Sequence, residues 1–325
     1  MPTAIKVIID GQKFYSQDNR ISINNLQPGY HSITIYYIKN GRDFNNYSLN
    51  LVQRFPGRRA LITGAASGFG LACAELLARE GWSFMLTDVD AARLSIVTAR
   101  FSAQGVRVGS EPCDVRDAAA LTRIVDAAAH VLGGIDLAVN AAGVAAVGPF
   151  LASDPGDWQW MFDINVHGVA NSCRAVLPHM LRNGRGLIIN VASAASFCTG
   201  ANMSGYNAAK AAVVALSETL QQEFGDERIQ TAAAMPGFFR TRLMEGARGP
   251  DRMLAGAQQL MEDSRLTAED VAEQVLFLAG AGRTHIVFPS KYRWIWRWKR
   301  LAPQSFQRWF PKIIARGQGA RRDTH

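Results

Sequence analysis

The sequence predicts an α/β fold built on an open, doubly wound parallel sheet. Short, almost uninterrupted apolar runs at residues 59–63 and 186–192 are typical of strands buried on both faces. The first run leads through a glycine-rich turn at residues 64–70 into an apolar pattern with helical spacing. A second strand-like run follows at residues 82–87. Strand, turn, helix and strand in this order form the repeating unit of a parallel sheet.

Length and composition are those of a soluble globular protein. The chain has 325 residues, 48% of them hydrophobic and 19% charged, with a mean hydropathy of −0.03. These values exclude collagen-like, coiled-coil and wholly disordered chains. Composition changes near residues 55–57, and positive charge is concentrated after residue 290. We therefore divide the chain into residues 1–52, 53–289 and 290–325.

The first segment is predicted to be a small antiparallel β module. Apolar and polar residues alternate with period two, as half-buried strands require. The alternation occurs at residues 5–9, 21–23, 32–36 and 47–51. Residues 26–33, with proline and glycine before a strand, resemble PEGA-like surface modules. We interpret the module as a binding or spacer unit and expect a chain that lacks residues 1–52 to fold.

The glycine-rich turn after the first strand of the parallel sheet predicts a dinucleotide-binding site. Glycines allow a pyrophosphate to approach the backbone, and the N–H groups and positive end of the following helix hold its charge. The residues expected at the cofactor here are Thr63, Gly64, Ser67, Gly68, Phe69 and Gly70.

Asp88 ends the next strand, eighteen residues after Gly70. At this spacing a carboxylate accepts a hydrogen bond from the adenosine ribose 2′-hydroxyl and repels a 2′-phosphate. No Lys or Arg occurs within the turn, and Val89 follows Asp88. NAD is therefore the preferred cofactor and NADP the less favoured one. A turn or helix-cap role for Asp88 is the alternative.

Further motifs follow along the parallel-sheet segment in a fixed order. With the turn from Thr63 to Gly70, they are Asp114-Val115, Asn140-Ala141-Ala142-Gly143, Asn165, Ser193, Tyr206-Asn207-Ala208-Ala209-Lys210, and Pro236-Gly237 with Thr241. In this order, residues from about 56 to 280 resemble the short-chain dehydrogenase/reductase family. The resemblance implies a Rossmann-type fold and an NAD(P) cofactor.

The resemblance also implies positions for the remaining cofactor contacts. Asp114 and Val115 would lie against the adenine. Asn140, Ala141 and Gly143 would end a strand beside the cofactor, with Asn140 steadying the sheet. Pro236, Gly237 and Thr241 would form the loop over the nicotinamide.

Tyr206 and Lys210 are four residues apart in a predicted helix, so both lie on one face. Moving a hydride between an alcohol and NAD also requires a group that moves the hydroxyl proton. A free phenol has a pKa of about 10, so an adjacent ammonium and the nicotinium charge must stabilise the phenolate. The resemblance assigns proton transfer to Tyr206 and the nicotinamide ribose to Lys210.

Ser193 and Asn165 complete the predicted catalytic set. Ser193 follows the apolar strand at residues 186–192, where strand ends of a parallel sheet meet ligands, and its hydroxyl can bind the substrate oxygen. Asn165 resembles the family's active-site Asn, which holds a water beside the lysine. Taken singly, either residue can equally be a satisfied polar group at the end of a strand or helix.

The cysteines and histidines predict no metal site and no disulfide framework. The chain has four Cys and six His, without metal-ligand or CxxC spacing. No secretion signal and no membrane-spanning run is recognised. Reduced thiols and a cytoplasmic location are the expectation.

The C-terminal segment is predicted to form two basic amphipathic helices. Residues 291–325 carry ten Lys or Arg residues and one acidic residue. The predicted apolar faces consist of Trp294, Ile295, Trp298 and Leu301, and of Phe306, Trp309, Phe310, Ile313 and Ile314. Aromatic side chains among cations favour an anionic membrane surface as the partner of residues 290–316. Packing on the protein's own substrate cleft or on a second subunit is the alternative, and nucleic acid is not expected.

These observations together predict an NAD(P)-dependent oxidoreductase that interconverts an apolar alcohol and its aldehyde or ketone. A non-catalytic binding or scaffold protein on the same fold is the alternative. The complete set of Asn165, Ser193, Tyr206 and Lys210 favours catalysis. A homodimer or homotetramer and a peripheral membrane contact are expected.

Overall fold

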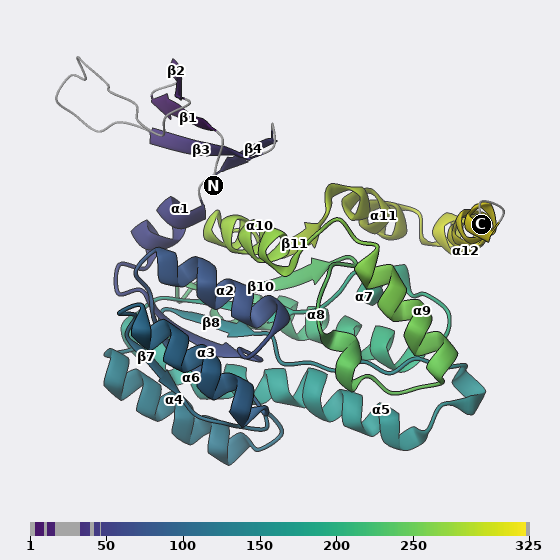
Figure 1. Cartoon of the computed structure of the whole chain (residues 1–325), viewed down its shortest axis with the longest axis horizontal. Coiled ribbons are helices and arrows are strands. Elements are labelled where there is room, and N and C mark those ends of the chain that lie inside the picture. Colours follow the sequence, from purple (N-terminus) through teal and green to yellow (C-terminus); the bar gives the residue numbers. More distant parts are fainter. Residues whose placement is uncertain (1–3, 10–11, 17–32, 40–41, 46, 323–325) are drawn as a thin grey trace.

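A computed structural model describes residues 4–9, 12–16, 33–39, 42–45 and 47–322, and the side chains of residues 51–313. These residues form a four-stranded antiparallel sheet near the N-terminus and a seven-stranded parallel sheet further along the chain (Figure 1). Helices cover the larger sheet, and the chain ends in two helices beside it (Figure 1). The predicted α/β class with a parallel sheet is confirmed.

The parallel sheet has the strand order β11-β10-β9-β8-β5-β6-β7. Its strands are β5 (Arg59–Thr63), β6 (Ser83–Thr87), β7 (Val108–Ser110), β8 (Leu137–Asn140), β9 (Gly186–Val191), β10 (Ile229–Pro236) and β11 (His285–Phe288). In β5, Ala60 and Ile62 enter one core while Leu61 enters the other. Both faces of the strand are buried, which explains its uninterrupted apolar run.

Two layers of helices enclose the sheet. One core contains side chains of α1 (Tyr47–Arg54), α2 (Gly68–Arg79), α3 (Ala91–Ala103) and α10 (Ala268–Gly280). The other contains side chains of α4 (Ala118–Leu132), α6 (Gly168–Asn183), α7 (Ala195–Cys198) and α8 (Ser204–Phe224). Helices α5 (Pro155–Phe162) and α9 (Asp251–Glu262) lie in the connections, with short helical turns at Phe150–Ala152, Asp163–His167 and Leu243–Gly246.

The chain reverses its direction of strand addition between β5 and β8. Strands β6 and β7 extend the sheet on one side of β5, and β8 then starts the other side. Thr63 at the end of β5 is paired with Asn140 at the end of β8. In an open parallel sheet the carboxyl ends at this switch point leave a crevice in which ligands bind.

The N-terminal sheet has the order β2-β1-β3-β4. It comprises β1 (Ala4–Ile9), β2 (Gln12–Ser16), β3 (Ile33–Lys39) and β4 (Arg42–Asn45). The predicted strands at residues 5–9 and 32–36 correspond to β1 and β3, whereas residues 21–23 lie outside the described residues. Two strands, β2 and β4, were not predicted.

The strand predicted at residues 47–51 is wrong, because these residues begin helix α1. Leu51 and Phe55 are four residues apart, so they face the same side, and both are fully buried in the main core. Arg54 donates to the carbonyl oxygens of Ala279 and Gly280, each at 3.0 Å, at the end of α10. Packing against α10 therefore overrides the strand-like alternation, and α1 spans the boundary predicted between residues 52 and 53.

The C-terminal segment forms α11 (Ser290–Leu301) and α12 (Pro303–Arg322), called here the C-terminal hairpin (Figure 1). The predicted face of Trp294, Ile295, Trp298 and Leu301 is divided. Trp294 and Leu301 are exposed, whereas Ile295 packs against the core and Trp298 packs against α12. The division arises because α11 lies on β11 and α7. None of the described helices is both long enough and apolar enough to span a membrane.

Candidate active site

The glycine-rich turn joins β5 to α2 at the switch point. Gly64 has a φ of +64°, and a Cβ there would lie 2.6 Å from the backbone nitrogen of Ala142. A Cβ at Gly70 would lie 2.2 Å from the carbonyl oxygen of Gly64. Ser67 is the N-cap of α2 and makes no side-chain cap, which leaves the first N–H groups of the helix available to an anion. The turn therefore fits a pyrophosphate.

The other residues predicted at this turn have different surroundings. Phe69 is buried in the core, so only its backbone faces the turn. Thr63 accepts a hydrogen bond from the Ala142 nitrogen at 3.3 Å, which ties the ends of β5 and β8 together. Thr241 lies beside the turn, because a Cβ at Gly68 would be 2.9 Å from its Oγ1.

Asp88 follows β6 and faces the glycine-rich turn. Its carboxylate accepts from the backbone nitrogen of Ala66 at 2.9 Å and from that of Asp90 at 3.0 Å. The N-cap of α3 is Asp90, which accepts from the Arg93 nitrogen. The helix-cap alternative for Asp88 is therefore excluded, although Asp88 does stabilise the local turn. Each oxygen has a lone pair left for a further donor.

Asp114 and Val115 follow β7 on the far side of β6. The Asp114 carboxylate accepts from the Arg116 Nε at 2.9 Å, and this guanidinium lowers the pKa of Asp114. Val115 is buried against Gly168, where a Cβ would approach Val115 Cγ2 to 2.5 Å. Val115 therefore fixes the start of α6.

A buried polar network lies under the crevice. Asn140 donates to Asn190 at 2.8 Å and accepts from Ser172 at 2.6 Å, and Asn190 donates to Ser217 at 3.0 Å. It joins β8, β9, α6 and α8 in the sheet interior, in agreement with a structural role for Asn140. Sequence reasoning missed Asn190, Ser172 and Ser217, although Asn190 interrupts the apolar strand β9 and was a usable signal.

Tyr206 and Lys210 lie on the buried face of α8, beside the end of β9. Lys210 donates from Nζ to the carbonyl oxygen of Val191 at 2.9 Å, and Nζ is 5.8 Å from the centre of the Tyr206 ring. Tyr206 is hydrogen-bonded to the side chain of Ser193, whose Oγ also accepts from the Ala195 nitrogen at 3.1 Å. Three of the four predicted catalytic side chains therefore meet at one place.

Burial determines the protonation of both residues on α8. It raises the pKa of Tyr206 to about 12, with the Ser193 hydrogen bond acting in the opposite direction. It also lowers the pKa of Lys210 to about 8. The lower phenol pKa that catalysis was expected to need is therefore not supplied by the protein alone, because desolvation exceeds the effect of the neighbouring groups.

Asn165 lies in a π-helical turn between α5 and α6 and is fully buried. Its side chain donates to the Val144 carbonyl and accepts from the Val144 nitrogen, each at 2.9 Å. A Cβ at Gly143 would lie 2.9 Å from Asn165 Oδ1 and 3.4 Å from Lys210 Nζ. Asn165 therefore clamps the segment after β8 next to Lys210, and the preceding Ala141 donates to the Thr63 carbonyl.

The loop after β10 closes one side of the crevice. Pro236 accepts from the Ala194 nitrogen, and Gly237 donates to the Phe288 carbonyl, both at 2.8 Å. The Tyr292 ring of α11 occupies the space at Gly237, where a Cβ would meet its Cε2 at 2.3 Å. The C-terminal hairpin therefore supports this loop from behind.

A cavity of about 260 Å³ lies at the start of α8, next to Tyr206. Val147, Trp158, Met161 and Met203 contribute its apolar walls, and Gly205 brings it to the residue before Tyr206. Asp154 and Asp157 are among its polar lining residues, and Asp157 is paired with Arg248 at 3.0 Å. Apolar and polar side chains therefore both line this cavity.

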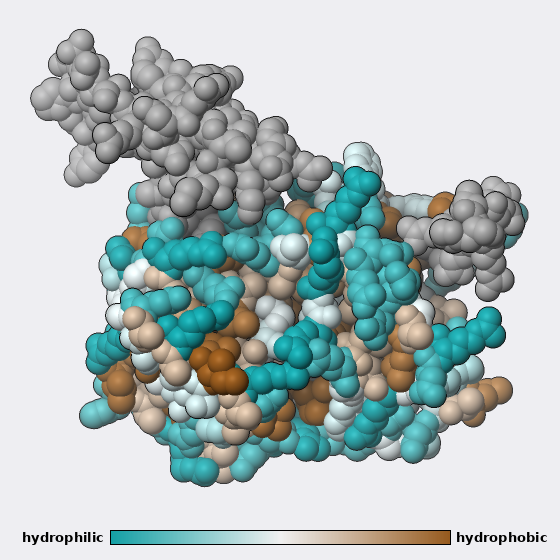
Figure 2. Space-filling view, viewed as in Figure 1, coloured by the Kyte–Doolittle hydropathy of each residue, from teal (hydrophilic) through white to brown (hydrophobic). Residues whose placement is uncertain are grey.

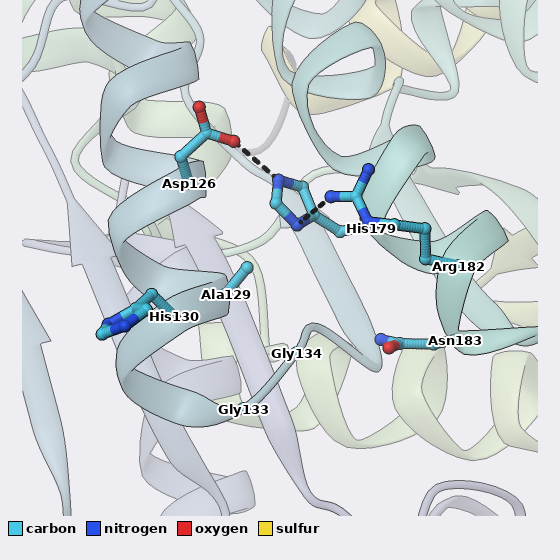
Figure 3. Close-up of a pocket in the computed structure, with 8 residues that line it drawn as sticks. All are labelled: Asp126, Ala129, His130, Gly133, Gly134, His179, Arg182 and Asn183. Atoms are coloured by element: carbon cyan, nitrogen blue, oxygen red, sulfur yellow. Dashed lines mark hydrogen bonds and ion pairs between the residues drawn. The ribbon is translucent and has the colours of Figure 1, made fainter.

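A second cavity, of about 340 Å³, lies between α4 and α6 (Figure 3). Among the side chains that line it, His179 is hydrogen-bonded to both Asp126 and Arg182, each at 2.8 Å (Figure 3). Gly133 and Gly134 precede β8, so this cavity is at the edge of the sheet opposite to Asn140. It contains none of the predicted site residues. Among the described residues no group of three His, Cys, Asp or Glu could hold a metal ion.

Comparison with known proteins assigns the family. A family model of the short chain dehydrogenases matches residues 58–251. The 2-keto-3-deoxy-L-fuconate dehydrogenase of Xanthomonas campestris is 35% identical, over 72% of this chain and 80% of that protein. A (2S)-[(R)-hydroxy(phenyl)methyl]succinyl-CoA dehydrogenase subunit of Thauera aromatica is 33% identical, over 68% of this chain and 89% of its own.

Solved structures agree with this assignment. A short-chain dehydrogenase/reductase from Burkholderia phymatum in complex with NAD has a TM-score of 0.71 and 32% identity, covering 78% of this chain and 95% of that one. An alcohol dehydrogenase from Thermococcus sibiricus complexed with 5-hydroxy-NADP has a TM-score of 0.63 and 27% identity, covering 72% and 97%.

The chain belongs to the short-chain dehydrogenase family. It is an NAD(P)-dependent oxidoreductase that acts on CH–OH groups. Residues 2–52 match a family described as a domain of unknown function (DUF8447), and the likeness of this segment to PEGA-like modules stays a prediction.

Proposed function

We propose that the protein is an NAD-preferring dehydrogenase or reductase of apolar alcohols and their carbonyl partners, with Tyr206 as the general acid and base. The observation that carries the proposal is the meeting of Ser193, Tyr206 and Lys210 beside a cavity with partly apolar walls. A non-catalytic scaffold would have no need to bury an ammonium beside a buried phenol.

The residues of the crevice divide the work. The glycine-rich turn and the N-terminus of α2 would hold the pyrophosphate, and the cofactor when bound supplies or accepts the hydride. Ser193 would orient the substrate oxygen toward Tyr206, which moves the hydroxyl proton. Lys210, fixed by the Val191 carbonyl, would stabilise the phenolate. Asn165 would act as a positioning residue that holds the Val144 segment beside Lys210.

Tyr206→Phe tests the proton-transfer role. Removing only the hydroxyl should lower kcat by about 10²- to 10⁴-fold while NAD affinity changes little. Turnover followed by the absorbance of NADH, with NAD affinity from fluorescence titration, makes the comparison. Tyr37→Phe, which changes a phenol on β3 of the N-terminal sheet, is the matched control. Activity of Tyr206→Phe within a few-fold of the parent would exclude the role.

The preference for NAD is inferred from Asp88 and its surroundings. The carboxylate faces the turn, Val89 is exposed, and Arg93 is paired with Asp90 and Glu245, each at 3.2 Å. The cation nearest in sequence is therefore already engaged. A 2′-phosphate would meet a negative charge here.

Asp88→Asn keeps an acceptor for the turn but removes the charge. We expect the NAD to NADP ratio of kcat/KM to fall by roughly tenfold or more, since a charged hydrogen bond contributes about 1.5–3 kcal/mol. Asp270→Asn, in the capping box of α10, is the matched control. An unchanged ratio in Asp88→Asn would show that Asp88 does not contact the ribose.

The apolar substrate class is inferred from the walls of the cavity beside Tyr206. If an alcohol's chain lies against Trp158 and Met161, each added methylene should raise kcat/KM by up to about fourfold until the cavity is full. A series of straight-chain primary and secondary alcohols tests this. Equal kcat/KM for short polar diols and for longer apolar alcohols would contradict the proposed class.

A further inference from the structure

The C-terminal hairpin has an inner and an outer side. On the inner side Tyr292, Ile295 and Trp296 of α11 pack against the core around α7 and β11. Phe306 and Phe310 of α12 are buried, with stacked rings 4.5 Å apart. These contacts attach α11 to the body of the protein and involve four of the seven aromatic residues among residues 290–313.

An aromatic cluster holds α12 against α11. The Trp298 ring lies edge-on to Phe306 at 5.3 Å and to Phe310 at 6.5 Å. Its Nε1 donates to Ser305 Oγ at 3.2 Å. The two helices are therefore joined by apolar packing of their own and present the remaining side chains outward.

Four large apolar side chains lie on the outer side. Trp294 is 72% exposed, Leu301 85%, Trp309 47% and Ile313 54%. Trp294 and Leu301 are two turns apart on α11, and Trp309 and Ile313 one turn apart on α12, so each pair shares a face. Trp294 and Trp309 are the only exposed tryptophans among the described side chains. Aromatic surface that stays in water gains no free energy from burial, and a patch of this kind is typical of a binding surface.

The charge of the outer side determines the kind of partner. Residues 290–313 contain seven Lys or Arg residues and no acidic residue. Arg297 lies over the Trp294 ring at 5.7 Å, and Arg308 and Lys312 lie over Trp309 at 5.6 and 5.0 Å. Arg300 is 3.8 Å from Glu218, so it is directed back to the body of the protein. Tryptophans flanked by cations match the boundary between acyl chains and anionic headgroups.

We infer that the outer side of the C-terminal hairpin docks on an anionic phospholipid bilayer. Trp294, Leu301, Trp309 and Ile313 enter the headgroup boundary, and Arg297, Arg308 and Lys312 contact lipid phosphates. The helices lie on the membrane and do not cross it. Figure 2 shows hydrophobic areas scattered among hydrophilic ones on the viewed face of the body.

The inference also explains where the hairpin is attached. Tyr292 supports Gly237 in the loop that closes the crevice and is hydrogen-bonded to the backbone of Phe238, which is itself 40% exposed. Helix α7, against which α11 packs, begins two residues after Ser193. Docking therefore brings the crevice close to the lipid surface, where apolar alcohols and aldehydes concentrate.

Co-sedimentation of the full chain with vesicles tests the inference. We compare vesicles of phosphatidylcholine alone with vesicles of equal parts phosphatidylcholine and phosphatidylglycerol, at low and high salt. The parent should bind the anionic vesicles and lose binding as salt screens the charges. Arg308→Gln combined with Lys312→Gln should weaken binding by roughly 30-fold, because each surface cation contributes about a factor of five.

The apolar contribution needs its own variant. Trp294→Ser with Trp309→Ser should weaken binding to anionic vesicles by at least roughly tenfold. The matched controls are Ile96→Ser, an exposed apolar residue on α3, and Arg123→Gln, an exposed cation on α4, which should bind like the parent. Circular dichroism and thermal unfolding verify the fold of every variant without relying on enzyme activity.

Three outcomes would overturn the inference. They are a parent that stays in the supernatant with anionic vesicles at low salt, tryptophan variants that bind as well as the parent, and a parent that self-associates through this face and does not bind vesicles. Sedimentation equilibrium identifies the last case by a lower mass for the double tryptophan variant. Vesicle binding is measured without substrate, so its failure is independent of the proposed function.

Discussion

Lys210 and Tyr206 are buried beside the end of β9, whereas Trp294 and Trp309 are exposed on the C-terminal hairpin. Both arrangements oppose what folding by itself favours. An ammonium loses hydration when it is buried, and an indole gains nothing when it stays in water. The first pair lies inside the crevice, where we propose that it takes part in the reaction. The second pair lies on an outer face, where we propose that it contacts a membrane. The comparison teaches that side chains in unfavourable surroundings mark sites where a ligand binds. The neighbouring residues then indicate which kind of ligand the site takes.

Helix α1 differs from both regions. Leu51 and Phe55 are fully buried in the main core, and Arg54 binds the end of α10. These contacts stabilise the fold, so we assign α1 to the framework of the dehydrogenase. A chain that begins at residue 53 would lack Leu51 and most of α1, which changes the expectation for the deletion of residues 1–52.

The largest expected effect belongs to this framework. Phe55→Ala should lower the free energy of unfolding by about 3–5 kcal/mol, since a fully buried aromatic ring is removed. Unfolding in urea measures it, and Phe150→Ala, at a ring that is 65% exposed, is the control. If both variants lose the same small amount, α1 is an attachment and not a part of the core.

Two deletions also test whether α1 belongs to the core of the dehydrogenase. Removal of residues 1–46 leaves α1 intact, and we expect such a chain to fold with nearly the parent's stability. Removal of residues 1–52 also removes Leu51, which should lower the free energy of unfolding by about 2–5 kcal/mol. Equal stability of the two deletions would contradict the assignment of α1 to the framework.

Lys210→Met should raise the free energy of unfolding at neutral pH, whereas the changes in α1 lower it. Burial lowers the pKa of Lys210 from 10.5 to about 8. Between these pH values the unfolded chain holds a proton that the folded protein releases, so the unfolding free energy of the parent rises with pH there. At neutral pH the buried charge therefore costs about 3 kcal/mol, which the methionine variant recovers while losing activity.

The pH dependence separates this charge effect from packing. The stability advantage of Lys210→Met over the parent should be largest at pH 7 and shrink by about 2.5 kcal/mol as pH approaches 10. Measurement below pH 10 avoids Tyr206, whose raised pKa makes stability fall only above its ordinary value of 10.0. Lys312→Met, at an exposed position, is the control. A pH-independent difference would mean that the Lys210 charge is not a burden on folding.

The smallest effect is expected on the outer side of the hairpin. Trp294→Ser should change the free energy of unfolding by no more than about 0.5 kcal/mol, because the side chain is already in water. Trp298→Ser should cost clearly more, since it removes the ring that holds Phe306 and Phe310. Thermal unfolding of the two variants measures the two losses of stability. A large loss of stability in Trp294→Ser would contradict this contrast between the two regions, because the Trp294 ring would then be part of the packed fold.

Much of the site could be predicted from the sequence because its signals are local. The glycine-rich turn needs only neighbouring residues between a strand and a helix, and Tyr206 and Lys210 need only a spacing of four. The parallel sheet follows from apolar runs whose residues alternate between two cores, as Leu61 and Ile62 do. Each of these signals is a property of one element, and the element's own geometry converts it into a position in space.

Tertiary packing decided what no single element contains. The Val191 carbonyl that holds Lys210 and the partners of Asn140 come from distant segments. Residues 47–51 alternate like a strand, yet α1 forms because Leu51 and Phe55 fill the core beside α10. The hairpin was predicted as amphipathic, but only the position of α11 on α7 and β11 selected which aromatic rings face the protein and which face solvent. Periodicity defines the faces of a helix, whereas the surface it meets determines which face is buried.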